Sequence, residues 1–429
     1  MNDSPICDVF GRRVWDSRGR PTVEAEVRLA DGSVGRAIAP AGASTGSGEA
    51  IDLRDGGSSF GGLDVVRAIG SVNGPIRAAL QDLDASDQAL VDRALIDLDG
   101  TEQKSRLGGN ATIAVSMATA HAVAVSRGQP LWRYLAGGHD PVIPLPQIQI
   151  FGGGAHAARR VDVQDFMVIC RGARDFCQAL EWTAEIYRAA GTLMQETGRL
   201  AGVADEGGYW PVFDSNEAAL DTLVQAIERA GFRPGEQVAI ALDVAASEFG
   251  GDGRYRLALD EREIERGEMI EMLEGWMARY PILSIEDPLG EDDEEGLVEF
   301  TARAGRVAQI IGDDYLVTNA DRVRRGIRVG ACNALLVKPN QAGTLTETRA
   351  ALEAAREAGW GTIVSARSGE TEDVTIAHLA VGWGAGQLKV GSFARSERMA
   401  KWNEVLRIEE SLGDAAAFGN RPEPLRGGH

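Results

Sequence analysis

The chain has 429 residues, and its 44 Lys and Arg against 64 Asp and Glu give a formal net charge of −20. At about 100–200 residues per domain, this length predicts two or three domains, or a large barrel with an addition. The acidity argues against nucleic acid or an anionic membrane as the partner and fits a soluble enzyme. Residues 1–10 lack the pattern of a signal peptide, and no apolar run approaches the roughly 20 residues of a membrane span, so we expect a cytoplasmic protein.

The first part of the chain is typical of a small α+β domain. Three β-like runs follow each other at residues 9–14, 22–29 and 35–39. Asp31-Gly32 between the second and third runs is a hairpin turn signal. Helical segments follow, including residues 109–126, and we expect this capping domain to cover residues 1–135.

Beyond residues 141–146, whose three prolines indicate a linker, strand and helix patterns alternate. Residues 215–230 are predicted to form an amphipathic helix, with Gly231 at its C-terminal cap. Short apolar strands recur at residues 237–242, 282–285, 308–311, 334–337, 361–364 and 387–390. Strands that alternate with helices imply parallel βαβ units, and their number favours a (β/α) barrel over an open sheet. We expect this catalytic domain to cover residues 141–429.

An ionisable or hydrogen-bonding residue follows each of these six apolar runs or ends it. The residues are Asp243, Glu286, Asp313, Lys338, the group Ser365, Arg367 and Ser368, and Lys389. In a (β/α) barrel the carboxyl ends of the strands converge on one mouth, where active sites are built. Each polar strand end is ordinary by itself, but six in succession indicate a functional site.

The residue types at these strand ends indicate metal-assisted chemistry on a small anion. Three carboxylates at one mouth repel one another unless a cation neutralises them, and hard oxygen ligands favour Mg²⁺ over zinc. The four cysteines are scattered without C-x-x-C spacing and are interpreted as reduced core thiols. Of the two lysines, one crowded by cations is expected to have a lowered pKa and to act as a base. The combination suits proton abstraction next to a carboxylate.

Two further segments are candidates for the same site. Residues 204–211 (ADEGGYWP) place Asp205 and Glu206 before two glycines, as in a turn that presents a carboxylate, although an ordinary acidic turn has the same pattern. Residues 41–46 (AGASTG) form a small loop that could lie over a phosphate, although most such loops are only connectors.

At these residues the sequence resembles the enolase family, and the likeness runs through nearly the whole chain. Its motifs are residues 15–21 (WDSRGRP), 43–46, 49–56 (EAIDLRDG), 99–110 (DGTEQKSRLGGN), 205–208 (DEGG), 242–249 (LDVAASEF), 284–289 (SIEDPL), 312–314 (GDD), 340–347 (NQAGTLTE), 367–373 (RSGETED) and 395–401 (RSERMAK). The resemblance implies an α/β fold, an enolase-type (β/α)8 barrel preceded by a smaller α+β lid domain. It also implies conversion of 2-phosphoglycerate to phosphoenolpyruvate by a homodimer or octamer.

The resemblance also assigns metal ligands by position. Asp243, Glu286 and Asp313 would hold a first Mg²⁺, and Ser44 would help to bind a second Mg²⁺ that arrives with the substrate.

The same resemblance distributes the catalytic and substrate-binding roles. Lys338 would remove the C2 proton, and Glu206, partnered by Asp165, would help the C3 hydroxyl to leave as water. The substrate-binding residues would be Arg367 and Ser368 for the phosphoryl group, Lys389 for the carboxylate, and His156, which would close over the substrate.

Among the departures from the family pattern, three are the important ones, because each replaces a larger polar side chain by a smaller one. Ala366 stands where the family has His, Asp165 replaces the Glu that partners the catalytic acid, and Gly152 replaces the first residue of an N-G-G loop. A later Asp of the family is His378 here. Because the metal ligands, base and anion-binding residues remain, we interpret the chain as a dehydratase with more space at the phosphoryl or hydroxyl end.

A substrate with extra bulk on phosphorus would fit that space. The chain therefore resembles the carboxyphosphonoenolpyruvate synthase-type homologues of phosphinate and phosphonate antibiotic pathways, in which a phosphonoformyl group replaces phosphate. Two alternatives stay open: a glycolytic enolase with an unusual site, and a non-catalytic enolase-fold scaffold or binding protein.

Overall fold

A three-stranded antiparallel sheet opens the chain in the computed structural model of the protein, which describes residues 4–419. Its strands are β1 (Ile6–Trp15), β2 (Pro21–Leu29) and β3 (Val34–Ile38), in the order β1-β2-β3. The three predicted strands are confirmed, with β1 extended at both ends. The outer ends of the two predicted domains, residues 1–3 and 420–429, lie outside the described residues.

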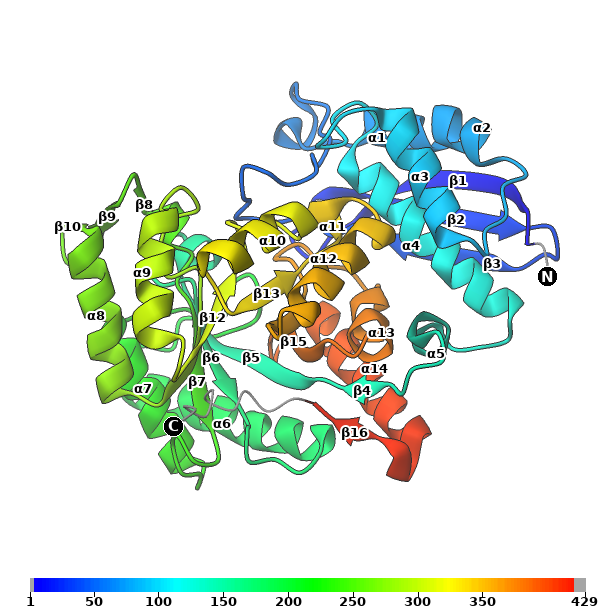
Figure 1. Cartoon of the computed structure of the whole chain (residues 1–429). Helices are drawn as coiled ribbons and strands as arrows, with labels where there is room; N and C mark the ends of the chain where they lie inside the picture. The colour runs from blue at the N-terminus through cyan, green and yellow to red at the C-terminus, as the bar shows by residue number, and fades with distance from the viewer. Residues whose placement is uncertain (1–3, 420–429) are drawn as a thin grey trace.

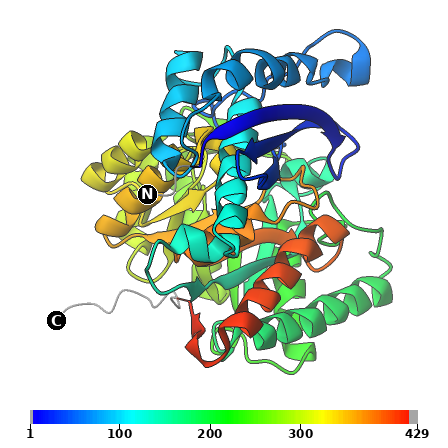
Figure 2. The ribbon, with the colours of Figure 1, turned by 90° about the vertical axis from the view of Figure 1, so that its right-hand side faces the viewer.

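The helices of this domain are α1 (Val66–Ser71), α2 (Arg77–Leu80), α3 (Gln88–Asp99), α4 (Gly109–Ser126) and α5 (Leu131–Ala136). Of these, α1 and α2 contact β1, and α4 contacts β2 and β3. The central helix α4 has the predicted bounds and is buried on nearly all sides, as expected for a helix that is apolar all round. Gly35 lets α4 approach β3 closely, because a Cβ there would lie 2.1 Å from Ala118 O. In Figure 1 this blue and cyan layer lies over the yellow and orange side of the second domain, and Figure 2 shows β1–β3 beside α4.

The second domain is a closed eight-stranded barrel in the order β11-β12-β13-β14-β15-β5-β6-β7. The strands are β5 (Leu145–Gly152), β6 (Asp165–Ile169), β7 (Ala239–Asp243), β11 (Ile282–Glu286), β12 (Gln309–Gly312), β13 (Ala334–Val337), β14 (Gly361–Ser365) and β15 (Gly386–Ser392). The predicted α/β barrel is confirmed. The six strands that the sequence predicts are consecutive in the barrel and run parallel to one another.

Helices form the outer layer of the barrel. They are α6 (Phe176–Glu196), α7 (Asn216–Arg229), α8 (Arg266–Arg279), α9 (Glu294–Ala304), α10 (Ala320–Val329), α12 (Leu345–Glu357), α13 (Thr375–Gly382) and α14 (Ser396–Leu412), with the short α11 (Pro339–Ala342) after β13. The predicted helix at residues 215–230 is α7: the side chain of Ser215 caps it, and Gly231 adopts a φ of +89° just beyond its end.

Smaller strands lie outside the barrel. A β-sheet of β8 (Gly250–Gly251), β9 (Arg254–Leu257) and β10 (Arg262–Glu265) follows β7, and β4 (Val142–Ile143) pairs with β16 (Ala417–Phe418).

One expectation from the sequence is wrong in this domain. The supposed linker at residues 141–146 is largely strand, because β4 and the start of β5 fall within it. The strand β6, which the sequence interpretation did not predict, runs antiparallel to both β5 and β7. The first residue of β6, Asp165, therefore lies level with Asp243, the last residue of β7.

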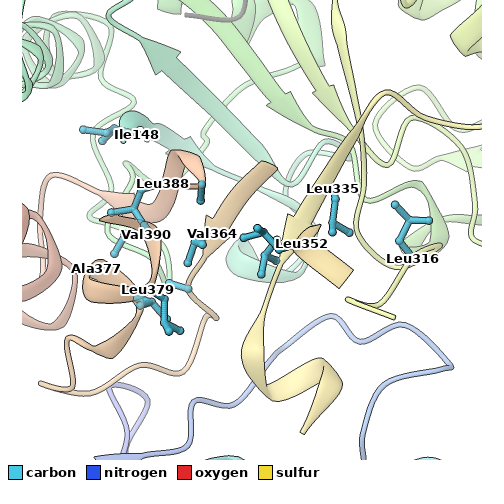
Figure 3. Packing of buried hydrophobic residues seen from close by; sticks show 14 of the residues in the cluster. Ile148, Leu316, Leu335, Leu352, Val364, Ala377, Leu379, Leu388 and Val390 are labelled. Atoms are coloured by element: carbon cyan, nitrogen blue, oxygen red, sulfur yellow. The ribbon is translucent and has the colours of Figure 1, made fainter. Parts of the chain in front are cut away.

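The barrel core follows the two-residue alternation of strands. Ile311, Ala334, Leu336 and Ile363 form one cluster made of strand residues alone. The alternate positions, such as Leu335, Val364 and Leu388, belong to the larger core that includes helix residues such as Leu352 and Leu379 (Figure 3). The two clusters are the inside of the barrel and the layer between strands and helices.

Two simpler features complete the fold. Within residues 4–419, no helix combines the length and the apolar character that crossing a membrane requires. All four cysteines are free, but only Cys170 and Cys332 are buried. The expectation of four core thiols is therefore wrong for Cys7 and Cys177, which are exposed.

Candidate active site

The same alternation places polar residues at the barrel mouth. Residues two apart on a strand share a face, so Lys389 lies above Gln387 and Glu286 above Ser284 on the inside of the barrel. The lower level is closed by amide hydrogen bonds from Gln147 Nε2 to Gln387 Oε1 (2.6 Å) and from Gln387 Nε2 to Gln309 Oε1 (3.2 Å). The upper level is the candidate site.

One small cleft gathers nearly all residues that the sequence predicts for the site. It is lined by Ala43, Ser44, His156, Gln164, Asp165, Glu206, Asp243, Lys338, Ser365, Ala366, Arg367, Ser368, Lys389 and Val390. The two predicted site residues outside this lining are Glu286 and Asp313, and each contacts a lysine of the cleft.

Lys389 joins three carboxylates from three neighbouring strands. Its Nζ lies 2.7 Å from Asp243 Oδ2, 2.8 Å from Glu286 Oε2 and 3.4 Å from Asp165 Oδ2. Burial lowers the pKa of Lys389, but these carboxylates raise it well above its usual value. Burial and the neighbouring Asp243 raise the pKa of Glu286. In this arrangement Lys389 is a cation that neutralises the carboxylate cluster.

Lys338 forms a buried ion pair with Asp313. Its Nζ donates a hydrogen bond to Asp313 Oδ2, and the two residues are 6% and 5% exposed. Burial lowers the pKa of Lys338, but Asp313 raises it more strongly and the net shift is upward. The expectation of a lysine base with a lowered pKa is therefore wrong for Lys338 in this arrangement, because its nearest neighbour is an acid.

His156 lies between the two acids that the sequence pairs. Its Nδ1 is 2.9 Å from Asp165 Oδ1, and its Nε2 is 3.7 Å from Glu206 Oε1. Burial alone would lower the pKa of His156, but Glu206 and Asp165 raise it to about 9. His156 is therefore an imidazolium near neutral pH. Among the residues that the structure describes, these three side chains also form one of two groups close enough together to hold a metal ion.

Local backbone structure positions the side chains of His156, Asp165 and Glu206. Asp165 starts the reversed strand β6, and His156 lies in a 3-10 turn at residues 154–157, directly after β5. Gln149 Nε2 donates to Asp165 Oδ1, and Gln149 Oε1 accepts the N–H of Gly208 in the turn that carries Glu206. The buried amide of Gln149 thereby ties the two acidic segments together.

Arg367 is buried under the loop at residues 41–46. Its NH1 lies 2.9 Å from Glu49 Oε2, and its NH2 donates a 2.9 Å hydrogen bond to Ser44 O. Gly42 is required here, because a Cβ at this position would lie 2.0 Å from Arg367 NH2. The loop also pairs with the segment after β14 through mutual backbone hydrogen bonds of Ala41 and Gly369, both 2.9 Å. The predicted loop therefore lies over Arg367, a residue that the family resemblance assigns to the phosphoryl group.

Ala366 is part of the cleft wall next to Arg367. It follows β14 directly, is 6% exposed, and its N–H donates a 2.9 Å hydrogen bond to Lys389 O. The backbone is thus fixed by the barrel, while the side chain offers only a methyl group to the cleft. Position 366 contributes no polar side-chain group there.

The residues present fit a divalent cation bound by oxygen. Asp243, Glu286 and Asp313 are all buried at neighbouring strand ends, and among residues 4–419 nothing donates a hydrogen bond to the buried Glu286 Oε1. An orphaned buried carboxylate oxygen in an all-oxygen donor set is suited to Mg²⁺. A second acidic group, Asp287, Asp313 and Asp314, is also close enough together to hold an ion, although Asp287 already accepts the N–H groups of Asp313 and Asp314 at 2.8 Å.

The structure adds residues that the sequence interpretation missed as members of the site. Glu49 contacts Arg367, and Gln341 contacts Asp313. Arg18 NH1 donates a 3.2 Å hydrogen bond to Ser368 Oγ. The guanidinium of Arg398 donates to the backbone carbonyls of Arg367 and Ser368. Each belongs to a motif quoted above for the family resemblance. Position within a long motif was the available signal, because composition and strand ends do not single these residues out.

The fold and the cleft together define an α/β-barrel protein with an N-terminal capping domain and with acids, lysines and an arginine gathered at the barrel mouth. Comparison with family models narrows this class. The model described as enolase, N-terminal domain matches residues 6–135, and the model described as enolase, C-terminal TIM barrel domain matches residues 140–423. The chain belongs to the enolase family, which supports a lyase activity of the enolase type.

Proposed function

We propose that this enolase-family protein is a specialised Mg²⁺-dependent hydro-lyase. Its substrate would be an analogue of 2-phosphoglycerate that carries a phosphonoformyl group, and its product would be carboxyphosphonoenolpyruvate. The observation that carries the proposal is Ala366, which puts a methyl group beside Arg367 and Ser368 where the family resemblance expects an imidazole. The missing side chain supports a larger phosphorus substituent at this end of the cleft.

The proposed reaction forms a C2=C3 double bond and releases one water. Lys338 Nζ takes the C2 proton, and the electron pair of the C2–H bond becomes the new π bond as the C3–O bond breaks. Because Lys338 is held as an ammonium by Asp313, it must first release a proton to solvent water to become the base. When bound at Asp243, Glu286 and Asp313, Mg²⁺ would supply electrostatic stabilisation of charge on the substrate carboxylate.

The leaving hydroxyl requires an acid on the opposite wall. Glu206 is 6% exposed and lines the cleft, so it can give a proton to the C3 oxygen. His156 holds a positive charge 3.7 Å from Glu206, and Asp165 fixes the orientation of the imidazole ring. The shorter side chain of Asp165 places its carboxylate about one methylene from the position that a Glu would reach. A displacement near 1 Å can change rates on the order of 10²-fold.

Cations around Ala366 support an additional negative charge on the substrate. Arg367 lies directly after it, and Arg18 reaches the same end of the cleft through Ser368 Oγ. Burial lowers the pKa of Arg18, although its Nε lies 3.5 Å from Asp16 Oδ2. An extra carboxylate near this end would therefore meet a second guanidinium besides that of Arg367.

The retained acid–base set also favours a second candidate, an ordinary glycolytic enolase. Lys338, Glu206, Arg367 and Lys389 all lie at one mouth, as dehydration of plain 2-phosphoglycerate would require. The two candidates share the chemistry and differ in the substituent on phosphorus.

The products distinguish the candidates. The purified protein is incubated with Mg²⁺ and either 2-phosphoglycerate or its phosphonoformyl analogue, and the phosphorus products are identified by ³¹P nuclear magnetic resonance. We expect the analogue to be converted to an enolpyruvate product and 2-phosphoglycerate to be consumed far more slowly. Efficient conversion of 2-phosphoglycerate would refute the specialised function, and conversion of neither compound would favour a non-catalytic scaffold.

A further inference from the structure

Gln341 lies where the barrel meets the capping domain. It belongs to α11, which follows β13 and packs against α4 of the capping domain (Figure 1). Its side chain is 2% exposed, and its backbone carbonyl accepts a 2.8 Å hydrogen bond from the N–H of Ala50. We define the lid segment as residues 41–50, which contain the loop over the cleft, Glu49 and Ala50.

The amide of Gln341 bridges two buried carboxylates from the two domains. Its Nε2 donates to Asp313 Oδ1 at 2.8 Å and to Glu49 Oε1 at 3.2 Å. The orientation of the amide is fixed, because Thr318 Oγ1 donates a 2.6 Å hydrogen bond to Gln341 Oε1. With both Nε2 hydrogens shared between carboxylates, the side chain has no freedom to flip.

Glu49 connects Gln341 to the lid segment and to Arg367. Its Oε1 accepts the N–H of Gly46 at 3.0 Å, and both its oxygens receive hydrogen bonds from the Arg367 guanidinium. One chain of buried contacts therefore runs from the lid segment through Glu49 and Gln341 to Asp313, and from Asp313 to Lys338. Each link is a charge-assisted hydrogen bond, the strong kind in a buried site.

We propose that Gln341 is a positioning residue that couples the order of the lid segment to occupancy of the carboxylate cluster at Asp313. The inference rests on the proposed function, because the coupling is useful to an enzyme whose lid segment should close only over a metal-loaded site. A cation bound to Asp313 changes the strength of that carboxylate as a hydrogen-bond acceptor for Gln341 Nε2. The amide transmits this change to Glu49 and to the lid segment. By linkage, ordering the lid segment strengthens cation binding by the same factor.

The test measures backbone hydrogen exchange in residues 41–50 by mass spectrometry, with and without Mg²⁺, and requires no turnover. In the native protein we expect Mg²⁺ to slow exchange of this segment by about tenfold, a typical size for allosteric coupling. In Gln341→Met, which keeps the side-chain volume and removes the amide, the effect of Mg²⁺ on the segment should disappear, while calorimetry still detects Mg²⁺ binding.

Gln309→Met is the matched control. Gln309 is a buried glutamine at the opposite end of the barrel strand that precedes Asp313, so it should keep the Mg²⁺ effect on the lid segment. If Gln341→Met does not fold, Thr318→Val removes the donor that orients the amide and should weaken the effect in the same direction. An equal Mg²⁺ effect in Gln341→Met or, failing that, in Thr318→Val would overturn the proposal. Absence of any Mg²⁺ effect in the native protein would do so as well. Because no substrate is added, these outcomes are independent of whether the proposed reaction is correct.

Discussion

His156 Nδ1 lies 2.9 Å from Asp165 Oδ1, a contact between the loop after one barrel strand and the first residue of the reversed strand beside it. The shorter acid at position 165 still reaches the imidazole and is itself fully buried. The opposite ring nitrogen is thereby directed toward Glu206. The contact makes His156 a fixed cation of the site.

The first prediction concerns the charge of His156. Its pKa is raised to about 9 from an unfolded value of about 6.5, so its contribution to stability is complete below about pH 6.5 and is lost as pH rises through about 9. This difference is worth about 3 kcal/mol. His156→Gln should abolish that part of the decline. Urea unfolding in chelator at pH 6 and pH 9.5 measures it, and an identical alkaline decline in both proteins would contradict the assignment.

Lys338→Ala should stop exchange of the substrate C2 hydrogen with solvent. A general base contributes about 10²–10⁴-fold, so exchange in D₂O should fall by at least about 10²-fold. Lys104→Ala is the control, because Lys104 is a buried lysine paired with Glu347 away from the cleft. Persistent exchange in Lys338→Ala would mean that another residue takes the proton.

Changes at position 366 should alter substrate preference. Ala366→His fills the space beside Arg367 and supplies a donor, so it should raise kcat/KM for 2-phosphoglycerate and lower it for the phosphonoformyl analogue. Ala366→Val fills part of the same space without a polar group, so it should hinder the analogue and give 2-phosphoglycerate no benefit. Steady-state rates with both substrates distinguish bulk from hydrogen bonding. An unchanged preference in Ala366→His would remove the structural basis of the specialised function.

His378 should make the protein sensitive to acid. Burial and the neighbouring His121 lower the pKa of His378 to about 4, although Glu404 lies 3.5 Å from its Nε2 and Asp373 is nearby. The unfolded chain therefore binds a proton first, and stability falls as pH drops from about 6.5 to about 4, by about 3 kcal/mol. His378→Asn should flatten this decline in urea unfolding, whereas the exposed His139→Asn should not. Equal acid slopes in all three proteins would show that His378 is not the responsible group.

Part of the site could be predicted from the alternation of side chains along each strand and from the residues at the strand ends. Glu286 could be placed at the barrel mouth from the sequence, because an apolar strand of known direction fixes where its last residue lies. Asp165 could not be placed in this way, since it begins a strand that runs in the opposite direction. Only its likeness to a family motif indicated a place in the site.

Long-range contacts limit what the sequence could predict. The pKa of Lys338 depends on which charged group is nearest, and that group is Asp313 rather than a cation. The bridge from Gln341 to Glu49 joins residues 292 positions apart, so no local pattern reveals it. The Lys389 contacts with three carboxylates likewise exist only once the barrel has closed.

The most direct test of the account is the ratio of kcat/KM for the phosphonoformyl analogue to kcat/KM for 2-phosphoglycerate, measured with the same Mg²⁺-loaded preparation by ultraviolet detection of the enol product. We expect a ratio above about 10², the size of effect that a misplacement near 1 Å can produce for the smaller substrate. A ratio at or below one would contradict it and would identify an ordinary enolase with an unusual cleft.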